Sequence, residues 1–376
     1  PDKGGREVGA SVSCPTNTGQ ANIGWWVYQY NNYGELIQQI DAKGQSSSLT
    51  YDELGRLENR IDRLTNSTIE SNTTWTYDTA VNGVGLLDNV QESLSGYMKA
   101  HPYDSLGRPS RLETFLPNGL GNHAELITYD SIGRVSRHYD AAGDGSWQDN
   151  GVENQYNNYG YLSAVVNAHD VNQRYYVVNS MDKRGNVTQS LGANGAIRTQ
   201  TFDPATGFLT HIDTDVVGGS KIQDDFYSLD AIGNLISRQN NVGAVKKESF
   251  CYDGLNRLIL SQTGTTTTNC SELPSGEQTV RYNSLGNLLF KQGKGAYTYN
   301  QFGDGPHAVS NTGGDGIYYY YDANGNLSHD SSGRTVAYTS FDKPTEIVKG
   351  DHKTRFQYGP NRSRYVRSDE NSNGIT

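Results

Sequence analysis

Apolar and polar residues alternate in short runs along this chain, and a turn signal interrupts the alternation every few residues. In residues 30–55, "YNNYGELIQQIDAKGQSSSLTYDELG", the pattern predicts a strand over 35–40, a turn over 41–44 and a strand over 45–51. A period of two is typical of β-strands, and the Asp-Ala-Lys-Gly stretch is typical of a turn. We therefore expect an antiparallel meander with little or no helix.

The turns between these runs repeat one pattern, Tyr-Asp-x-x-Gly-Arg-x, or a close variant of it. Starts are mostly 20 to 30 residues apart, which is too short and too turn-rich for helical repeats. Full copies begin at Tyr30, Tyr51, Tyr103, Tyr129, Tyr156, Met181, Leu229, Tyr252, Tyr282, Tyr299 and Tyr321. Weaker copies begin at Tyr77, Tyr139, Phe202, Phe341 and Tyr358, and the copy at Phe202 is one residue longer.

Each copy has a physical reason to turn. The Asp or Asn side chain can accept a hydrogen bond from the backbone two residues on, and the Gly supplies a positive φ. Asn256 replaces that Gly in "YDGLNRL", and Asn is the next best residue for the left-handed conformation.

The residues on either side of the turn indicate its length. A type I turn followed by a left-handed Gly sets Asp52 opposite Arg56 and Tyr51 opposite Leu57. A four-residue loop would set Tyr51 opposite Arg56 and Thr50 opposite Leu57. The first register pairs acid with base and apolar with apolar, so it is favoured.

We assign the motif residues a structural role. They are Tyr51, Asp52, Gly55, Arg56, Tyr103, Asp104, Gly107, Arg108, Tyr129, Asp130, Gly133, Arg134, Tyr252, Asp253, Arg257, Tyr321, Asp322 and Gly325. Polar stretches at 66–74, 116–122 and 264–276 are expected to form longer hairpin loops on the surface.

Composition narrows the architecture further. The 376 residues include 43 Gly and 26 Tyr but only 2 Met, and Leu, Ile, Val and Phe together make up roughly a fifth of the chain. The 10% aromatic content and regular repeats argue against disorder. Because 25 or more strands cannot remain one flat sheet, and because aliphatic residues are too few for a large sandwich core, we expect a curved wall that is one sheet thick over much of its area.

Charge and hydropathy exclude two classes of partner. The formal net charge is −10 and Arg recurs singly beside Asp, which argues against a nucleic-acid surface. No apolar run approaches about 18 residues, so no membrane span is expected.

The motifs "YDELGRL", "YDSLGRP", "YDSIGRV" and "YDANGNL" resemble the YD or Rhs repeats of bacterial Rhs toxins, of the B and C components of Tc toxin complexes, and of animal teneurins. The resemblance implies an all-β strip of hairpins coiled into a curved, hollow shell, which in the bacterial proteins encloses a C-terminal toxic domain. In teneurins the similar shell belongs to a cell-surface adhesion protein.

The resemblance divides the chain into a non-repeat segment (1–24), a YD-repeat shell segment (25–367) and a tail (368–376) that would lead to a downstream region. We expect a section of shell wall from a secreted or surface protein, without enzymatic activity or cofactor. Its partners would be adjoining shell segments and an enclosed toxin domain of the same polypeptide. Self-cleavage is assigned to no residue, because the core segment that follows such repeats is not in this sequence.

Other chemistry is weakly indicated. Of the three cysteines, Cys251 and Cys270 lie at the ends of a predicted hairpin and form either a disulfide or two free thiols. Eight scattered histidines favour surface or packing roles over metal binding. Asp140 and Asp144 fit two positions of a calcium loop, but Ala142 and Gly151 occupy two others, so an ordinary hairpin loop is favoured.

Two alternative functions remain open at this point. The chain is rich in Tyr and contains Trp25, Trp26, Trp75 and Trp147, which could bind a glycan or a protein receptor in an adhesin. Packing is the favoured role, because aromatic residues favour strands regardless of a ligand. A polysaccharide-cleaving enzyme would need a localised carboxylate pair, whereas the motif distributes Asp to every turn.

Overall fold

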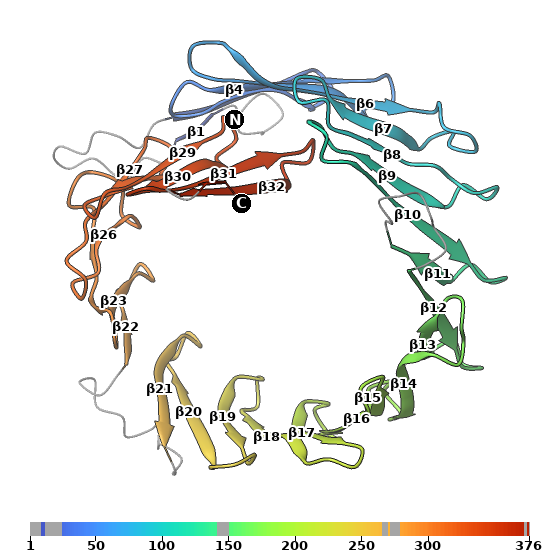
Figure 1. Ribbon diagram of the computed structural model, residues 1–376. Helices are drawn as coiled ribbons and strands as arrows, with labels where there is room; N and C mark the ends of the chain where they lie inside the picture. Colours follow the sequence, from blue (N-terminus) through green and yellow to red (C-terminus); the bar gives the residue numbers. More distant parts are fainter. Residues whose placement is uncertain are drawn as a thin grey trace. The chain divides into compact units, whose positions relative to one another are not determined.

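The computed structural model describes residues 9–11, 25–140, 150–264, 270, 279–371 and 374–375. These residues form β-strands, turns and irregular segments, with no α-helix among them, as the alternating pattern predicts. Among the same residues no helix is long and apolar enough to span a membrane. The chain divides into two compact units: unit 1 comprises 1–124 and 293–376, and unit 2 comprises 125–292. Figure 1 shows the strands in chain order.

Unit 1 contains two groups of consecutive strands. The first group is β1 (Gly9–Ser11), β2 (Trp25–Tyr30), β3 (Leu36–Ile40), β4 (Ser46–Tyr51), β5 (Leu57–Arg63), β6 (Ile69–Tyr77), β7 (Leu87–Glu92), β8 (Met98–Ala100) and β9 (Arg111–Phe115). The second is β24 (Gly295–Ala296), β25 (Thr298–Tyr299), β26 (Val309–Asn311), β27 (Tyr319–Tyr321), β28 (Leu327–Asp330), β29 (Arg334–Tyr338), β30 (Pro344–Lys349), β31 (His352–Tyr358), β32 (Arg364–Asn371) and β33 (Gly374–Ile375).

Unit 2 continues the same hairpin pattern. Its strands are β10 (Asn122–Tyr129, which begins in unit 1), β11 (Val135–Tyr139), β12 (Gly151–Tyr156), β13 (Leu162–Asn167), β14 (Arg174–Met181), β15 (Val187–Gly192), β16 (Ala196–Phe202), β17 (Leu209–Val216), β18 (Lys221–Leu229), β19 (Leu235–Asn240), β20 (Lys246–Tyr252), β21 (Leu258–Gly264), β22 (Val280–Tyr282) and β23 (Leu288–Lys291).

Strands that follow one another in sequence pair antiparallel. In unit 1 this holds from β1 to β9 and from β27 to β33. In unit 2 it holds from β10 to β21. The predicted all-β strip of antiparallel hairpins is therefore confirmed. β32 continues through Asn371, beyond the boundary at 367 that the repeat pattern suggests.

The register at the motif turn is the three-residue one. Tyr51 pairs with Leu57, and the amide of Asp52 donates to the carbonyl of Arg56 at 2.9 Å. Gly55 has φ +76°, and Asn256 occupies the equivalent position with φ +59°. Between motifs, the amide of Gly44 donates to the carbonyl of Asp41 at 3.0 Å, as the predicted second turn requires.

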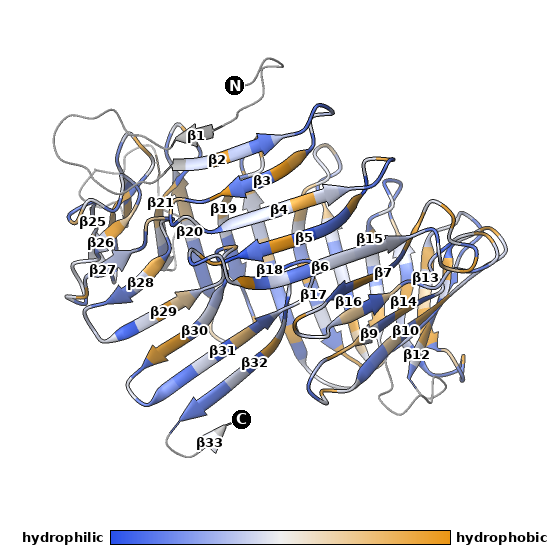
Figure 2. Cartoon of the chain, turned by 90° about the horizontal axis from the view of Figure 1, so that it is seen from above, coloured by the Kyte–Doolittle hydropathy of each residue, from blue (hydrophilic) through white to orange (hydrophobic). Residues whose placement is uncertain are grey.

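The buried apolar core is sparse in both units. Among the described residues it comprises Trp75, Val90 and Tyr97 in unit 1, and in unit 2 its largest fully buried aliphatic side chain is Val166, with Ile212 and Leu260 also buried. Hydrophobic and hydrophilic segments alternate along strands such as β3 and β5 (Figure 2). Such a strip cannot rely on a large apolar core, so polar contacts between successive hairpins must contribute to its stability.

Three predictions about the turns need comment. The loop expected at 66–74 is wrong, because β6 begins at Ile69 and a tight turn with Ser67 at φ +66° joins it to β5. The weak copy expected to begin at Phe341 begins instead at Tyr338, since the amide of Thr339 donates to Lys343 and Asp342 takes the left-handed position at φ +58°. The loop at 116–122 is confirmed up to residue 121, where β10 follows, whereas most of 264–276 lies outside the described residues.

Candidate functional site

The motif turn is a small hydrogen-bonded unit built on its Asp. One carboxylate oxygen of Asp52 accepts from the amides of Leu54 (3.0 Å) and Arg56 (2.9 Å). The other accepts from Nε of Arg56 at 2.6 Å. The same arrangement recurs at Asp104, Asp130 and Asp253 with their own arginines. The sequence motif thus satisfies the backbone groups of a tight turn with side chains from the turn itself.

Eight of the motif tyrosines tie their hairpin to the one before it. The hydroxyl of Tyr51 donates to the carbonyl of Leu36, the residue six positions after the preceding motif Tyr, at 2.9 Å. Equivalent bonds of 2.7 to 3.1 Å join Tyr77 to Leu57, Tyr103 to Leu87, Tyr156 to Val135, Tyr252 to Leu235, Tyr321 to Val309, Tyr338 to Leu327 and Tyr358 to Pro344. We call this series the tyrosine ladder.

The motif arginines add a second link in the same direction. The guanidinium of Arg56 lies 4.4 Å from the ring centre of Tyr77 and donates to Asp78 at 2.6 Å, so it spans two repeats. Arg134 stacks on Tyr156 at 4.0 Å, and Arg257 on Tyr282 at 4.5 Å. Each stacked pair is expected to stabilise the junction by about 0.5–1 kcal/mol. The motif therefore forms both the turn and the contact between turns.

These contacts shift the pKa of the motif carboxyls downward. Hydrogen bonds from Arg108 lower the pKa of Asp104, and hydrogen bonds from Arg257 lower that of Asp253. At Asp52 partial desolvation raises the pKa, but the backbone and side-chain hydrogen bonds of Arg56 outweigh it and leave the pKa below its usual value. The motif aspartates are thus held as anions in paired turns, unlike a general acid that must keep its proton near neutral pH.

The tip of most motif turns carries an exposed apolar residue three positions after the Tyr. Leu54 is 75% exposed and Tyr159 is 87% exposed. The set comprises Tyr33, Leu54, Leu106, Ile132, Tyr159, Ile232, Leu255 and Leu285. Sequence reasoning assigned no role to these positions.

In unit 1, turns of the second strand group rest on strands of the first. Asp62 on β5 is 0% exposed, and its carboxylate accepts from Ser47 (2.6 Å), from Nε of Arg60 (2.9 Å) and from Arg362 (2.8 Å). Arg362 lies in the turn between β31 and β32 and is partly exposed, so the buried Asp62 carboxylate and its two arginines join segments about 300 residues apart. We call it the Asp62 cluster.

Three further contacts extend this junction along the strands. Nζ of Lys43 lies 3.0 Å from Asp322, and Nδ2 of Asn324 donates to Asp41 at 2.6 Å. The amide of Ser340 donates to the carboxylate of Glu70 at 2.6 Å. All of these bonds pair a motif turn of the second group with the first group, so motif turns can dock on another part of the strip.

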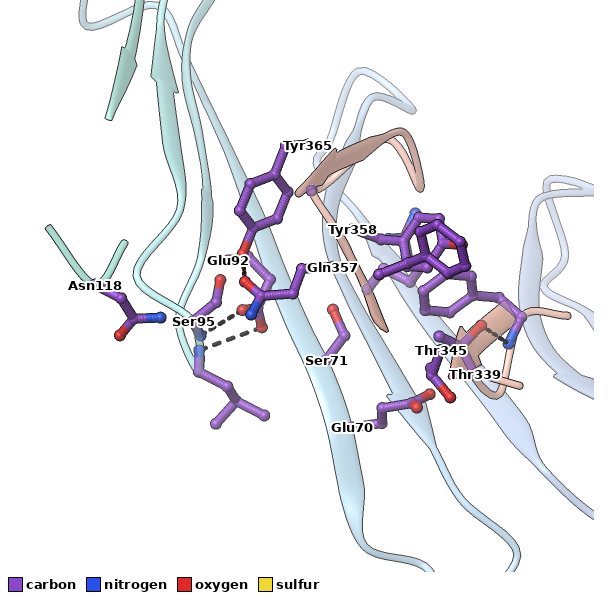
Figure 3. A pocket seen from close by; sticks show the side chains of 15 residues that line it. Glu70, Ser71, Glu92, Ser95, Asn118, Thr339, Thr345, Gln357, Tyr358 and Tyr365 are labelled. Atoms are coloured by element: carbon purple, nitrogen blue, oxygen red, sulfur yellow. Dashed lines mark hydrogen bonds between the residues drawn. The ribbon is translucent and has the colours of Figure 1, made fainter. Parts of the chain in front are cut away.

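A cavity of about 340 Å³ lies beside the Asp62 cluster (Figure 3). Its lining includes Glu70, Glu92, Tyr358 and Tyr365. Both carboxylates already serve the backbone, since Glu70 accepts from Ser340 and Glu92 accepts from the amides of Asn72, Leu94 and Ser95. The described geometry offers these two carboxylates as structural acceptors rather than as an acid–base pair.

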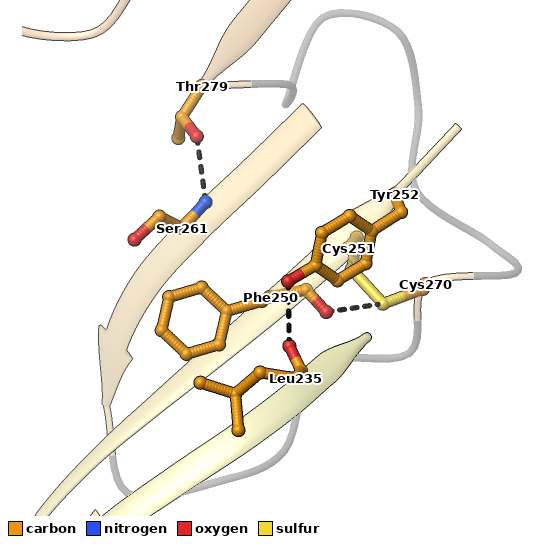
Figure 4. Close-up of a disulfide and its surroundings, with 7 residues drawn as sticks. All are labelled: Leu235, Phe250, Cys251, Tyr252, Ser261, Cys270 and Thr279. Atoms are coloured by element: carbon orange, nitrogen blue, oxygen red, sulfur yellow. Dashed lines mark hydrogen bonds between the residues drawn. A yellow bond between two sulfur atoms is a disulfide. The ribbon is translucent and has the colours of Figure 1, made fainter. Parts of the chain in front are cut away.

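Cys251 and Cys270 form a disulfide, which resolves the two alternatives that the sequence left open. Cys251 lies on β20 and is 1% exposed, and Sγ of Cys270 lies 3.5 Å from the carbonyl oxygen of Phe250 on the same strand (Figure 4). The bridge links Cys270 to β20 across a sequence separation of 19.

Two candidate metal sites remain, one predicted from the sequence and one found only in the structure. Asp140 is described at the end of β11, but Asp144 lies outside the described residues together with Trp147, so the weak calcium hypothesis stays untested. Among the described residues, one group of three metal-ligating side chains occurs, at His211, Asp213 and Asp224. Sequence reasoning missed it because it depends on the register of two strands, and it missed the Asp62 cluster because a repeat pattern does not show which repeats meet.

Comparison with solved structures places the fold. The chain is similar to TcdB2-TccC3-Cdc42, with a TM-score of 0.73 and 17% identity over 94% of this chain and 20% of that one. It is similar to TcdB2-TccC3-TEV, with a TM-score of 0.71 and 16% identity over 94% of this chain and 21% of that one. A Tc holotoxin pore from Photorhabdus luminescens matches over 94% of this chain and 20% of that one, with a TM-score of 0.62 and 17% identity.

The chain therefore has the fold of Rhs/YD shell-type proteins and spans about a fifth of the length of these structures. No family model matches the sequence, and no curated protein matches it. At 16–17% identity the likeness is one of fold, and function must be argued from the residues.

Proposed function

We propose that this chain is a non-enzymatic wall segment of a larger secreted or surface-exposed Rhs/YD-repeat protein, and that the wall encloses a toxic or effector polypeptide. The tyrosine ladder carries this proposal. The repeated side chains of the sequence are used to join one hairpin to the next, which is what a continuous wall requires and what a localised active site does not.

The solved neighbours support the enclosed cargo. They include TcdB2-TccC3-TEV, TcdB2-TccC3-Cdc42 and TcdB2-TccC3 without its hypervariable C-terminal region. For the present chain, the enclosed polypeptide would be a further part of the protein to which this wall segment belongs.

The experiment is protease protection in that longer protein. A polypeptide downstream of the wall should resist digestion while the wall is intact, and Asp62→Ala, which breaks the junction within unit 1, should make it sensitive. Digestion of the downstream polypeptide at equal rates in the intact and Asp62→Ala proteins would contradict enclosure.

Scattering provides a second test on the chain itself. A compact globule of this length should have a radius of gyration near roughly 21 Å. A clearly larger value is expected for a wall around empty space, whereas the compact value would contradict a container.

An adhesin is the second candidate, because exposed aromatic side chains favour it. Tyr33 is 89% exposed and Tyr159 is 87% exposed, and Tyr161 lies beside Tyr159 at a surface groove between two motif turns. Exposed rings of this kind could stack on sugars or insert into a receptor. A glycan array separates the two proposals, since a container should retain no glycan and an adhesin should lose binding in Tyr159→Ser.

A further inference from the structure

The hairpin formed by β17 and β18 in unit 2 brings three metal-ligating side chains to one face. His211 and Asp213 are two positions apart on β17, and Asp213 pairs directly with Asp224 on β18. His211 pairs with Phe226, so Asp224 is its diagonal neighbour. Side chains at alternate positions share a face, and register alone therefore places all three together.

The ligand atoms lie close enough to share one ion. Nε2 of His211 is 2.7 Å from Oδ1 of Asp224, and one ligand atom from each of the three residues lies within 4.8 Å of the others. Metal–ligand bonds of about 2.0–2.2 Å in a tetrahedron separate the ligand atoms by roughly 3.3–3.6 Å. Small rotations of the aspartate side chains would bring the ligand atoms to this spacing.

An unsatisfied oxygen points to a missing partner at this position. Oδ2 of Asp213 is held by Nζ of Lys221 at 2.5 Å. Oδ1 of Asp213 is buried and has no hydrogen-bond partner among the residues that the structure describes. A buried acceptor without a partner costs about 1–3 kcal/mol, and like charges directly opposite in a ladder are also unfavourable. A cation would relieve both effects.

We propose that His211, Asp213 and Asp224 bind a divalent transition-metal ion such as Zn²⁺. The imidazole nitrogen disfavours Ca²⁺ and Mg²⁺, which prefer oxygen ligands, and favours the borderline metals that accept one nitrogen and two carboxylates. The ion replaces the proton between Nε2 of His211 and Oδ1 of Asp224 and is coordinated by Oδ1 of Asp213. Nζ of Lys221 remains bonded to Oδ2 of Asp213. Water completes the coordination.

The surroundings hold the imidazole in place. The ring of Phe226 stacks on His211 with centroids 3.9 Å apart and an interplanar angle of 12°. Support of this kind fixes the orientation of a ligand before the metal arrives. An ion at this position would join β17 to β18, so its role would be to stabilise one hairpin of the wall.

The test is isothermal titration of ZnCl₂ into the untagged chain in a Cys14→Ser background, which removes the cysteine outside the disulfide. One equivalent of zinc is expected to bind. Asp213→Asn and His211→Gln should each weaken binding at least tenfold, as expected when a ligand is lost. Asp213→Asn also removes the like-charge pair, so its fold should persist even if His211→Gln is unstable.

A matched control exists in the same unit. His138 on β11 lies 3.2 Å from Glu125 on β10, in the same diagonal relation but without a second carboxylate in a three-residue group. His138→Gln should leave zinc affinity unchanged. Absence of saturable binding, or equal affinity in Asp213→Asn and His138→Gln, would overturn the proposal.

Titration with CoCl₂ gives an independent readout. Cobalt bound to a nitrogen and two carboxylates should give visible absorption bands that Asp213→Asn abolishes and His138→Gln does not change. Bands that persist in Asp213→Asn would place the metal elsewhere.

Discussion

The Asp62 cluster makes the strongest prediction about what holds unit 1 together. Its carboxylate is 0% exposed and is shared by Arg60, Ser47 and Arg362. Replacing Asp62 by Ala leaves Arg60 without its carboxylate, at a place where burial already lowers the pKa of Arg60. Removing one partner of a buried ion pair costs about 3–5 kcal/mol, so Asp62→Ala should destabilise unit 1 by that amount.

Replacing Arg362 should cost less, because Asp62 keeps two of its partners. Arg362→Ala removes the 2.8 Å bond to Asp62, the 3.1 Å bond to Ser47 and the stacking on Phe341 at 4.8 Å. A hydrogen bond to a charged group contributes about 1.5–3 kcal/mol, so we expect a loss of about 2–3 kcal/mol. The double variant should lose less than the sum of the two, because the sites share one network.

Urea unfolding followed by tryptophan fluorescence measures these differences. A Trp147→Phe background confines the signal to the tryptophans of unit 1, of which Trp75 lies 5.4 Å below Arg60. Arg364→Ala is the matched control, since Arg364 stacks on Phe356 at 4.9 Å and lies outside the cluster. If Arg362→Ala were no less stable than Arg364→Ala, or if the losses for Asp62 and Arg362 were additive, the cluster would not be the junction described above.

Four further predictions concern the repeat. Gly55→Val should lower the free energy of unfolding by about 1–3 kcal/mol, because φ is +76° and a Cβ atom would lie 2.8 Å from Oε1 of Glu35. Gly55→Asn should cost less, since Asn256 adopts the same conformation, and equal urea melts for the two variants would refute the turn assignment. Tyr156→Phe should lose about 1 kcal/mol with its ladder bond, measured against Tyr159→Phe. Reducing Cys251–Cys270 should cost unit 2 about 3 kcal/mol. An unchanged melting curve after verified reduction would contradict this. Folding lowers the pKa values of Asp104 and Asp253, so their contribution to stability is present above the unfolded pKa near 3.8 and is lost as the pH falls through the folded pKa values. The urea midpoint should therefore fall as the pH drops below about 4, and it should fall less steeply in Asp104→Asn.

The sequence predicted the local structure well, because each turn is specified within seven residues. Asp52, Gly55 and Arg56 encode the loop length, the positive φ and the ion pair, and nothing outside the motif is needed to read them. Prediction failed where another residue can replace the expected one. At Tyr338 the turn uses Thr339 and Asp342 in place of Asp and Gly, and the motif was placed three residues too late.

The junctions between distant segments were beyond sequence reasoning for a different reason. The shared Tyr-Asp-x-x-Gly pattern alone does not distinguish the turn containing Asp322, which docks on Lys43, from the turn containing Leu54, whose tip is exposed. Asp62 and Arg362 are separated by 300 positions, and a charge pair at that distance has no local signature. Only the register of the strands and the packing within unit 1 bring them together.

The residues at the turn tips suggest how one motif can form both docked turns and turns with exposed tips. Two of the turns that dock in unit 1 carry Asn324 and Phe341 three positions after the Tyr, where Asn324 bonds to Asp41 and Phe341 lies beneath Arg362. The third docks through Arg362, four positions after its Tyr. Turns whose tips are exposed carry residues such as Leu54 and Ile132 at the same position. We ask whether these exposed apolar residues, which recur at one position of the motif, contribute to a contact surface. If the wall proposal is right, exchanging the two classes of tip should have different effects. Asn324→Leu should destabilise unit 1 in urea melts. Leu54→Asn should leave the melt unchanged and reduce any association of the chain at high concentration. A stabilising effect of Asn324→Leu would show that the polar tip is not what positions the docked turn.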